Sequence, residues 1–486
     1  MTRDCEVHAD ARDARFGAVQ DAPLMLSVSG ARGLVGKSMT PEVAHDFTRA
    51  FAAHVRSRLA VASRPTLVIG RDGRGSGESL AHAVRAGACA SGFDVVDLGI
   101  VATPTVGLMI GHLGCVGGIV ITASHNPIEW NGMKTLNADG LALPIADAND
   151  VIARFHARSS ELAHSPGTAV ERRDGDEIHV ARVLSNIDCE SIRAKKFRVA
   201  LDSVNGGGSR AGRMLLEALG CEVVHLNAEH TGIFAHTPEP LEANLGQLMR
   251  AVADGQTIVM GFAQDPDADR LALVDERGRF VGEEYTLALC ALRLLQRHNG
   301  GVIATNLSTS RMIDTIAARF AGSRVVRTAV GEANVVAGLK PSGGIGGGEG
   351  NGGFIWPRIC WVRDSLSAMA LVLELCAHEG HSLSTIAAEI RKFSMVKQKM
   401  DLNAMGGNAA VPAALAKVRA FFQANPEARI DQTDGIRIDL PGGWVHVRAS
   451  NTEPIIRVIA EASSLDEANE LCTLCRRAAG IPELAQ

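Results

Sequence analysis

The sequence lacks charge blocks and long apolar runs. We find no block of five or more like charges, and the formal net charge is −5 with a pI of about 6.4. This pattern argues against a nucleic-acid or membrane surface and favours small solutes as partners. The longest apolar stretch, GLMIGHLGCVGGIVITA, is interrupted by His112 and falls short of the ~20 residues that cross a bilayer. No membrane span is predicted.

Paired cysteine motifs and a signal peptide are also missing. The ten cysteines are scattered, and the one close pair, Cys472 and Cys475, has no second pair to complete a zinc site. We therefore expect buried thiols in a reducing cytoplasm. Residues 1–23 mix charges of both signs without the apolar core of a signal peptide, which predicts a polar N-terminal extension.

What the sequence does contain is a recurring strand–helix–strand pattern. TLVIGRD, ESLAHAVRAGACAS and GFDVVDLG form one copy, FRVALDSVNG, SRAGRMLLEALG and GCEVVHLN a second, and GVIATNLSTSRMIDTIAARFAGSRVVRT a weaker third. Such units build mainly parallel sheets with helices on both faces. The 486 residues also suit three or four domains. We predict three related α/β domains at 24–170, 171–280 and 281–392.

The last ~90 residues have a different pattern. DGIRIDLPGGWVHVRAS predicts two strands around a Pro-Gly-Gly turn, RVIAEA a further strand, and LDEANELCTLCRRAAG a helix. These elements predict a small α+β domain over residues 393–486.

ITASHNPIEWNGMK follows an apolar strand and brings Ser124 and His125 together just before Pro127. Ser, Asn and Pro are common in turns, so a plain turn is one interpretation. However, the carboxyl end of a strand is where open α/β sheets place reactive groups, and Ser124 could carry a phosphoryl group there. A serine hydroxyl is a weak nucleophile and needs a base or a metal beside it.

GFAQDPDADRLALVDE supplies a metal candidate. Asp265, Asp267 and Asp269 follow a predicted strand at a spacing of two, which in an extended chain points all three carboxylates the same way. Hard oxygen ligands on a tight loop suit Mg²⁺. An EF-hand is the competing interpretation. We reject it because Arg270 replaces the required glycine and strands, not helices, are expected on both sides.

Two further stretches carry polar groups suited to a sugar phosphate. SGGIGGGEGNGG is not a Walker loop, and by itself it is typical of a linker. Its Glu349 and Asn351, on backbone that a ligand can approach closely, suit sugar hydroxyls. RASNTEPIIR is either a surface turn or a phosphate cradle, for which it offers Arg448, Ser450, Asn451, Thr452 and Arg457.

Taken together, these four stretches resemble the α-D-phosphohexomutase family. TASHNP resembles its phosphoserine loop, DPDADR its metal loop, GEGNGG its sugar loop and RASNTEP its phosphate-binding loop, while SVSGARGLVG and GRDGRGSGE match two more family segments. The resemblance covers the chain after residue 23. It implies three related α/β domains and a C-terminal α+β domain around a central cleft. The implied reaction converts a hexose 1-phosphate to a 6-phosphate, or the reverse, through a bisphosphate.

The resemblance also implies a role for each candidate residue. Ser124 is expected to carry the phosphoryl group, with Mg²⁺ held by Ser124, Asp265, Asp267 and Asp269. Lys134, Arg32 and His125 are expected to assist with charge, proton movement and loop orientation. Residues expected to bind substrate are Arg270, Glu349, Asn351, Arg448, Ser450, Asn451, Thr452 and Arg457. A hexose 1,6-bisphosphate is expected to act as activator.

The sequence departs from the family at the sugar loop. Many members carry Glu-x-Ser-Gly-His there, whereas this chain has Asn351 in place of the serine and Gly353 in place of the histidine. The EGNGG form resembles archaeal-type phosphoglucosamine and phosphomannomutases. It favours glucosamine phosphate, with mannose and glucose phosphates as alternatives. A metal-dependent phosphatase acting through phosphoserine and a non-catalytic sugar-phosphate sensor are the competing functions.

Overall fold

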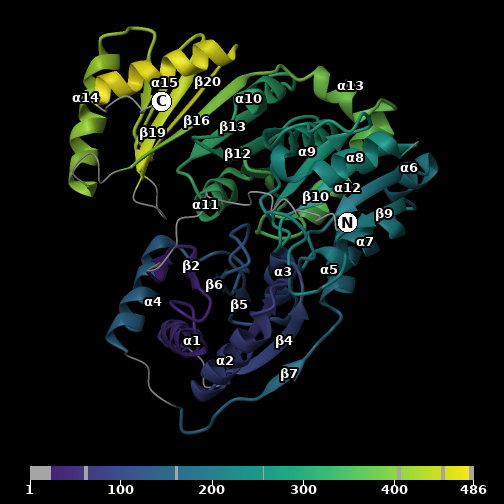
Figure 1. Ribbon diagram of the computed structural model, residues 1–486, viewed down its shortest axis with the longest axis vertical. Helices are drawn as coiled ribbons and strands as arrows, with labels where there is room; N and C mark the ends of the chain where they lie inside the picture. Colours follow the sequence, from purple (N-terminus) through teal and green to yellow (C-terminus); the bar gives the residue numbers. More distant parts are fainter. Residues whose placement is uncertain are drawn as a thin grey trace, which may run out of the picture.

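The computed structural model describes residues 23–59, 64–158, 163–255, 257–401, 407–449 and 455–480. It contains four β-sheets, each at the centre of one domain. In Figure 1 the first domain lies at the bottom, the fourth at the upper left, and the second and third to the right. The predicted N-terminal extension lies outside the described residues except for Pro23, and so do Ser450, Asn451 and Thr452. No helix within the described ranges is long and apolar enough to cross a membrane.

The first domain is a seven-stranded sheet of order β1-β2-β6-β5-β3-β4-β7 with helices on both faces. Along β3, Leu67 and Ile69 pack in one core with α1 and α2, whereas Val68 packs on the opposite face with α3. Burial on both faces explains why this strand is a continuous apolar run. Its elements are β1 (Met25–Ser27), β2 (Gly30–Leu34), α1 (Pro41–Arg56), β3 (Thr66–Arg71), α2 (Gly77–Ala90), β4 (Asp94–Ile100), α3 (Thr103–Leu113), β5 (Gly117–Ile121), β6 (Trp130–Asn137), α4 (Ile145–Ala157) and β7 (Ala169–Glu171).

The second domain has a four-stranded sheet of order β11-β10-β8-β9. Parallel pairing of β8 with β9, like that of β3 with β4, confirms the strand–helix–strand units predicted from the sequence. The elements are α5 (Gly175–Leu184), α6 (Cys189–Lys195), β8 (Arg198–Asp202), α7 (Ser209–Ala218), β9 (Glu222–Leu226), the 3₁₀ turn η1 (Glu242–Asn244), α8 (Gly246–Asp254), β10 (Ile258–Gln264) and β11 (Leu271–Asp275).

The third domain has a sheet of order β13-β12-β14-β15, in which β12 and β13 are parallel as predicted. Its elements are α9 (Glu283–His298), β12 (Val302–Asn306), α10 (Met312–Ala317), β13 (Arg324–Thr328), α11 (Glu332–Ser342), β14 (Gly346–Glu349), β15 (Gly353–Ile355), α12 (Ser365–Glu379) and α13 (Leu383–Ala388). Helix α12 is buried on all sides, and it packs in a hydrophobic core that also contains residues of the first and second domains. A shared core of this kind fixes the three domains against one another.

The fourth domain is an antiparallel sheet of order β16-β20-β19-β18-β17 packed against two helices. The predicted strands and C-terminal helix are confirmed as β18, β19, β20 and α15, and α15 begins with a capping box between Ser464 and Glu467. Its elements are β16 (Ser394–Asp401), η3 (Asn408–Ala410), α14 (Val411–Gln423), β17 (Arg429–Asp431), β18 (Ile436–Asp439), β19 (Gly443–Ala449), β20 (Ile455–Ala462) and α15 (Leu465–Ala479).

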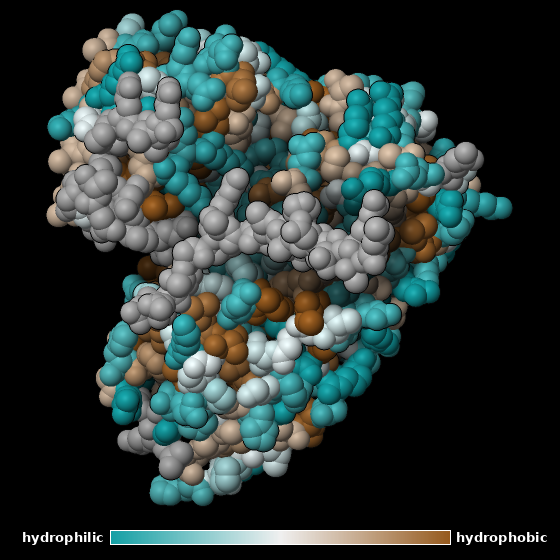
Figure 2. Space-filling model, viewed as in Figure 1, coloured by the Kyte–Doolittle hydropathy of each residue, from teal (hydrophilic) through white to brown (hydrophobic). Residues whose placement is uncertain are grey.

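The fourth domain contacts the third through side chains of both. His446 Nδ1 lies 2.8 Å from Ser308 Oγ, and the Arg311 backbone N–H donates to Glu461 at 3.0 Å. The predicted four-domain architecture is therefore confirmed. The molecule is indented between the first and fourth domains, at the left of Figure 2.

Candidate active site

Three of the candidate residues lie where strands of three different sheets end. Ser124 follows β5, Asp265 follows β10, and Glu349 is the last residue of β14. The carboxyl ends of strands are the usual place for ligands in open α/β sheets. Side-chain contacts connect these ends: the Ser124 hydroxyl donates to Asp265 Oδ2 at 3.1 Å, and Arg363 contacts both Asp269 and Glu349.

Ser124 is held in a buried turn. It is 1% exposed, and its backbone φ is +51°, a left-handed conformation that a non-glycine residue adopts only where its surroundings enforce it. Its backbone N–H donates to Thr122 Oγ1 at 2.8 Å, and Thr122 Oγ1 in turn donates to Asp72 at 2.6 Å. The turn and active-site interpretations of TASHNP are thus compatible in this structure.

Arg74 holds that turn in place. Its guanidinium donates to four backbone carbonyls of the loop, at distances between 2.6 and 2.8 Å, and its Nε donates to Asp72 at 3.0 Å. Those carbonyls belong to Ser124, Asn126, Pro127 and Trp130. The sequence alone did not indicate a role for Arg74, although this residue lies within the GRDGRGSGE segment that resembles the family.

We expect Arg74→Lys to lower kcat by about a hundredfold. An ammonium cannot donate to the four carbonyls with the planar geometry of a guanidinium, and a small displacement of a reacting group lowers the rate by about this factor. Hydrogen exchange should rise at 124–130. Arg56→Lys is the matched control, since Arg56 also donates to carbonyls of the first domain, at Ser91 and Gly92. Unchanged kcat and exchange in Arg74→Lys would contradict this role.

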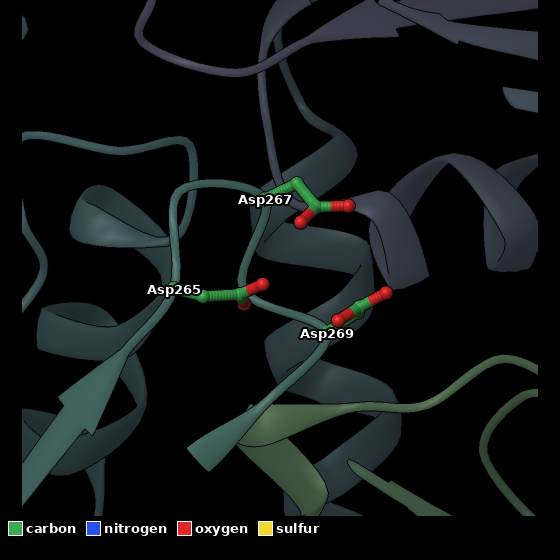
Figure 3. Close-up of side chains that lie close together, drawn as sticks. All are labelled: Asp265, Asp267 and Asp269. Atoms are coloured by element: carbon green, nitrogen blue, oxygen red, sulfur yellow. The ribbon is translucent and has the colours of Figure 1, made fainter. Parts of the chain in front are cut away.

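The three aspartates form a compact buried cluster. One oxygen from each lies within 4.8 Å of the others, and Figure 3 shows the three side chains extending from a single loop. The expectation of an extended chain was wrong, because Ala268 has φ +54° and closes a turn by donating its N–H to Asp265 O at 2.9 Å. The carboxylates converge because of this turn. Strands β10 and β11 flank the loop, as the rejection of an EF-hand required.

The cluster has features suited to a cation. Asp267 Oδ1 and Asp269 Oδ1 are buried and have no hydrogen-bond partner in the described part of the chain. Burial and the two neighbouring carboxylates raise the pKa of Asp265 well above its usual range. Carboxylate oxygens that have free lone pairs and repel one another fit Mg²⁺.

Lys134 and Arg363 offset part of this negative charge. Lys134 Nζ lies 2.5 Å from Asp267 Oδ2 and 2.9 Å from Asp269 Oδ2, while Arg363 Nη2 lies 2.6 Å from Asp269 Oδ2. Burial disfavours the ammonium, but the two carboxylates outweigh it and raise the pKa of Lys134. Burial likewise opposes the charge of Asp269, yet its cationic neighbours keep its pKa below the usual value.

Arg32 and His125 lie beside the serine turn. Arg32 Nη1 donates to Asn126 Oδ1 at 3.0 Å, and His125 Nδ1 lies 3.3 Å from Ser124 Oγ. Burial, together with the charges of Arg270 and Arg32, lowers the pKa of His125 to about 2. The imidazole is therefore neutral at physiological pH.

The sugar-loop residues differ in how they are held. Glu349 is 5% exposed and accepts from Asn306 Nδ2 at 2.9 Å, Gly331 N at 3.1 Å and Arg363 Nη1 at 2.9 Å. Asn351 instead accepts from the Gly353 N–H at 3.2 Å within its own loop.

Arg270 and Arg448 each present a nitrogen suited to an anion. Arg270 Nε and Arg448 Nη2 are buried without a hydrogen-bond partner among the described residues. Arg448 lies directly opposite Arg457 in the β19–β20 ladder, so both side chains leave the same face of the sheet. Two neighbouring guanidiniums suit a dianionic phosphate.

Glu284, next to the sugar loop, gives the fold a pH dependence. Part of its surface is exposed, yet burial of the carboxyl raises its pKa to about 8, and its Oε2 accepts from the Ser310 N–H at 3.1 Å. Because the ordinary pKa is 4.5, the folded state binds more protons than the unfolded state between these values. The contribution of Glu284 to stability should therefore be fully present below pH 4.5 and be lost as the pH rises to 8, by at most about 1.4 kcal/mol per pH unit.

We expect Glu284→Gln, which stays neutral and keeps the acceptor for Ser310, to remove this component. The difference in Tm between Glu284→Gln and wild type should become steadily more positive from pH 5 to pH 8, because only the wild type loses stability through this group. Glu283→Gln is the control, because Glu283 pairs with Lys397 at 3.3 Å instead. Parallel Tm profiles for wild type and Glu284→Gln would show that Glu284 titrates normally.

The fold and this site define the class of protein: a phosphohexomutase-type isomerase, an intramolecular phosphotransferase. Comparison with known proteins agrees. The four domain profiles of the phosphoglucomutase/phosphomannomutase family, three alpha/beta/alpha domains and the C-terminal domain, match residues 25–162, 177–278, 283–393 and 396–477. The chain therefore belongs to the phosphoglucomutase/phosphomannomutase family.

Relatives match along most of their length. A "Phosphoglucomutase/phosphomannomutase" of Thermococcus kodakarensis is 37% identical, covering 92% of this chain and 96% of the relative. A "Probable phosphoglucosamine mutase" of Methanopyrus kandleri is 35% identical, covering 91% and 95%. A crystal structure of a phosphoglucomutase/phosphomannomutase family protein from Burkholderia thailandensis superposes with a TM-score of 0.81 at 27% identity, covering 93% and 97%.

Proposed function

We propose that this enzyme interconverts hexose 1-phosphates and hexose 6-phosphates through phosphorylated Ser124. The main support is the buried Ser124 hydroxyl, 3.1 Å from the carboxylate of Asp265 in a loop of three aspartates. Phosphoserine would give its phosphoryl group to the free hydroxyl of the sugar phosphate. The resulting 1,6-bisphosphate would reorient in the active site and return its other phosphoryl group to Ser124. Added 1,6-bisphosphate would activate the enzyme by phosphorylating Ser124.

We further propose that Asp265, Asp267 and Asp269, together with Ser124, hold Mg²⁺. Bound there, the ion would supply positive charge to offset the charge of the transferring phosphoryl group. This assignment is supported by one buried oxygen each of Asp267 and Asp269, which accepts no hydrogen bond from the described residues.

The roles proposed for the neighbouring side chains follow from their charge states. Lys134, whose raised pKa keeps it an ammonium, would stabilise charge on the phosphoryl oxygens rather than act as a base. Arg32, which donates to Asn126 of the turn, would do the same, since a guanidinium does not deprotonate in proteins. His125 has too low a pKa for a general base at neutral pH, so it would orient the serine turn.

The substrate is held at both ends in this proposal. Arg448 and Arg457, with Ser450, Asn451 and Thr452, would bind the phosphate that is not reacting, and Arg270 would contact the substrate near the metal loop. Glu349 would read ring hydroxyls, while Asn351 would contribute by shaping the loop. Glucosamine phosphate is the proposed sugar, supported by the EGNGG form and by the name of the Methanopyrus kandleri relative.

The test is turnover with Mg²⁺, a trace of the matching 1,6-bisphosphate and the 1-phosphates of glucosamine, N-acetylglucosamine, glucose and mannose. We expect 6-phosphate to form, with the highest kcat/KM for glucosamine 1-phosphate. Steady release of inorganic phosphate without isomerisation would indicate the phosphatase instead. Binding without turnover, unaffected by Ser124→Ala, would indicate the sensor.

A further inference from the structure

Gly353 has no side chain, and Arg363 occupies the space that one would fill. A Cβ built on Gly353 would lie 2.2 Å from Arg363 Cδ, 3.0 Å from its Cγ and 3.1 Å from its Nε. All three of the nearest atoms thus belong to one side chain. Many family members carry histidine at this position of the sugar loop, whereas in this chain the loop has no side chain there and Arg363 lies against it from outside.

Arg363 is fixed between three carboxylates from three elements. Its Nη2 lies 2.6 Å from Asp269, its Nη1 2.9 Å from Glu349 and its Nε 3.1 Å from Glu332. The backbone is held as well, because the Arg363 N–H donates to Glu332 at 3.1 Å. The guanidinium therefore connects the metal loop directly to the sugar loop.

The contacts of Glu349 show what this connection does. Its Oε1 accepts from Asn306 and Gly331, whereas its Oε2 has Arg363 as its one partner among the described residues. Without Arg363, Oε2 would lose its donor and the carboxylate would be held through Oε1 alone. A carboxylate that reads ring hydroxyls has to keep both oxygens in place.

We propose that Arg363 is a positioning residue for sugar recognition, which orients Glu349 from the space left by Gly353. This inference rests on the proposed function, since it takes Glu349 to be the sugar-reading group. The competing explanation is that Arg363 only neutralises buried negative charge. In that case lysine, which keeps the charge but cannot contact several carboxylates with a planar fork, would serve equally well.

The test compares Arg363→Lys and Gly353→Ala with wild type. Gly353→Ala leaves every charge in the chain and displaces the guanidinium. Gly111→Ala is its control, because a Cβ on Gly111 in α3 meets no atom within 4 Å. We expect both Arg363→Lys and Gly353→Ala to raise the KM for sugar 1-phosphate by about tenfold, the effect of one misplaced charge-assisted hydrogen bond, with a smaller change in kcat. The Gly111→Ala variant should match wild type.

The possible outcomes distinguish the positioning role of Arg363 from the mutase function on which it rests. If wild type isomerises sugar phosphates and both variants keep its KM, the positioning role is wrong and the mutase function stands. If Arg363→Lys keeps the wild-type KM while Gly353→Ala does not, charge alone is sufficient and the positioning role is also wrong. If wild type forms no 6-phosphate from any of the four sugars, the proposed function fails and the role of Arg363 in sugar recognition fails with it.

Discussion

Replacing Ser124 with alanine should lower mutase turnover by at least about a thousandfold, because removal of a covalent nucleophile eliminates the pathway rather than weakening it. The same change should abolish phosphorylation. Intact-mass measurement of active wild-type protein should show a species heavier by ~80 Da, the mass that a phosphate adds to a hydroxyl. That species should be absent from Ser124→Ala after incubation with the 1,6-bisphosphate.

The matched control for this variant is Ser185→Ala, which removes an exposed hydroxyl that donates to Arg182 O. Ser124→Gly is a second control, because glycine adopts the positive φ of this position without strain and should be equally inactive. Isomerisation by Ser124→Ala at the wild-type rate would contradict the phosphoserine pathway. A protein that turns over normally yet never gains ~80 Da would contradict it as well.

Much of this fold was predictable because the patterns that indicate its strands and helices lie within short segments of the sequence. Apolar runs followed by Asp72 and Asp202 marked parallel strands, and alternation around a Pro-Gly-Gly turn marked the antiparallel strands of the last domain. Ser124 and the three aspartates were also found from short motifs. The structure places the Ser124 hydroxyl 3.1 Å from Asp265 and gathers the three aspartates, but the convergence of the aspartates depends on a turn at Ala268 that spacing alone did not indicate.

Arg74 and Arg363 were missed because their roles are not local. Arg74 is separated by some 50 residues from the carbonyls that it holds, and Arg363 by 94 residues from Asp269. A lone arginine in a sequence is ordinarily a solvated side chain, and only the folded chain shows that these two are buried among acceptors. For Gly353, the sequence showed a missing imidazole but not the side chain that occupies its place.

The second large effect is expected at the metal loop. Asp267 Oδ2 accepts from Thr103 Oγ1 at 2.6 Å and from Lys134 at 2.5 Å, whereas Oδ1 is buried and accepts no hydrogen bond from any residue that the structure describes. In Asp267→Asn the amide oxygen can keep both contacts while the NH₂ group replaces Oδ1. An NH₂ group cannot bind a cation. The substitution therefore removes one proposed ligand atom and one charge with little change in shape.

We expect wild type to gain Tm on addition of Mg²⁺, since a ligand that binds only the folded state stabilises it by mass action, and EDTA should reverse that gain. Asp267→Asn should fold, show no gain in Tm at Mg²⁺ concentrations that saturate wild type, and lose at least about a hundredfold in turnover. Asp254→Asn, at the exposed end of α8, should behave as wild type. An Asp267→Asn protein with the wild-type Mg²⁺ response would remove Asp267 from the metal site. Loss of turnover with that response intact would instead assign Asp267 to balancing the charge of Lys134, because the substitution removes the negative charge that lies 2.5 Å from the ammonium.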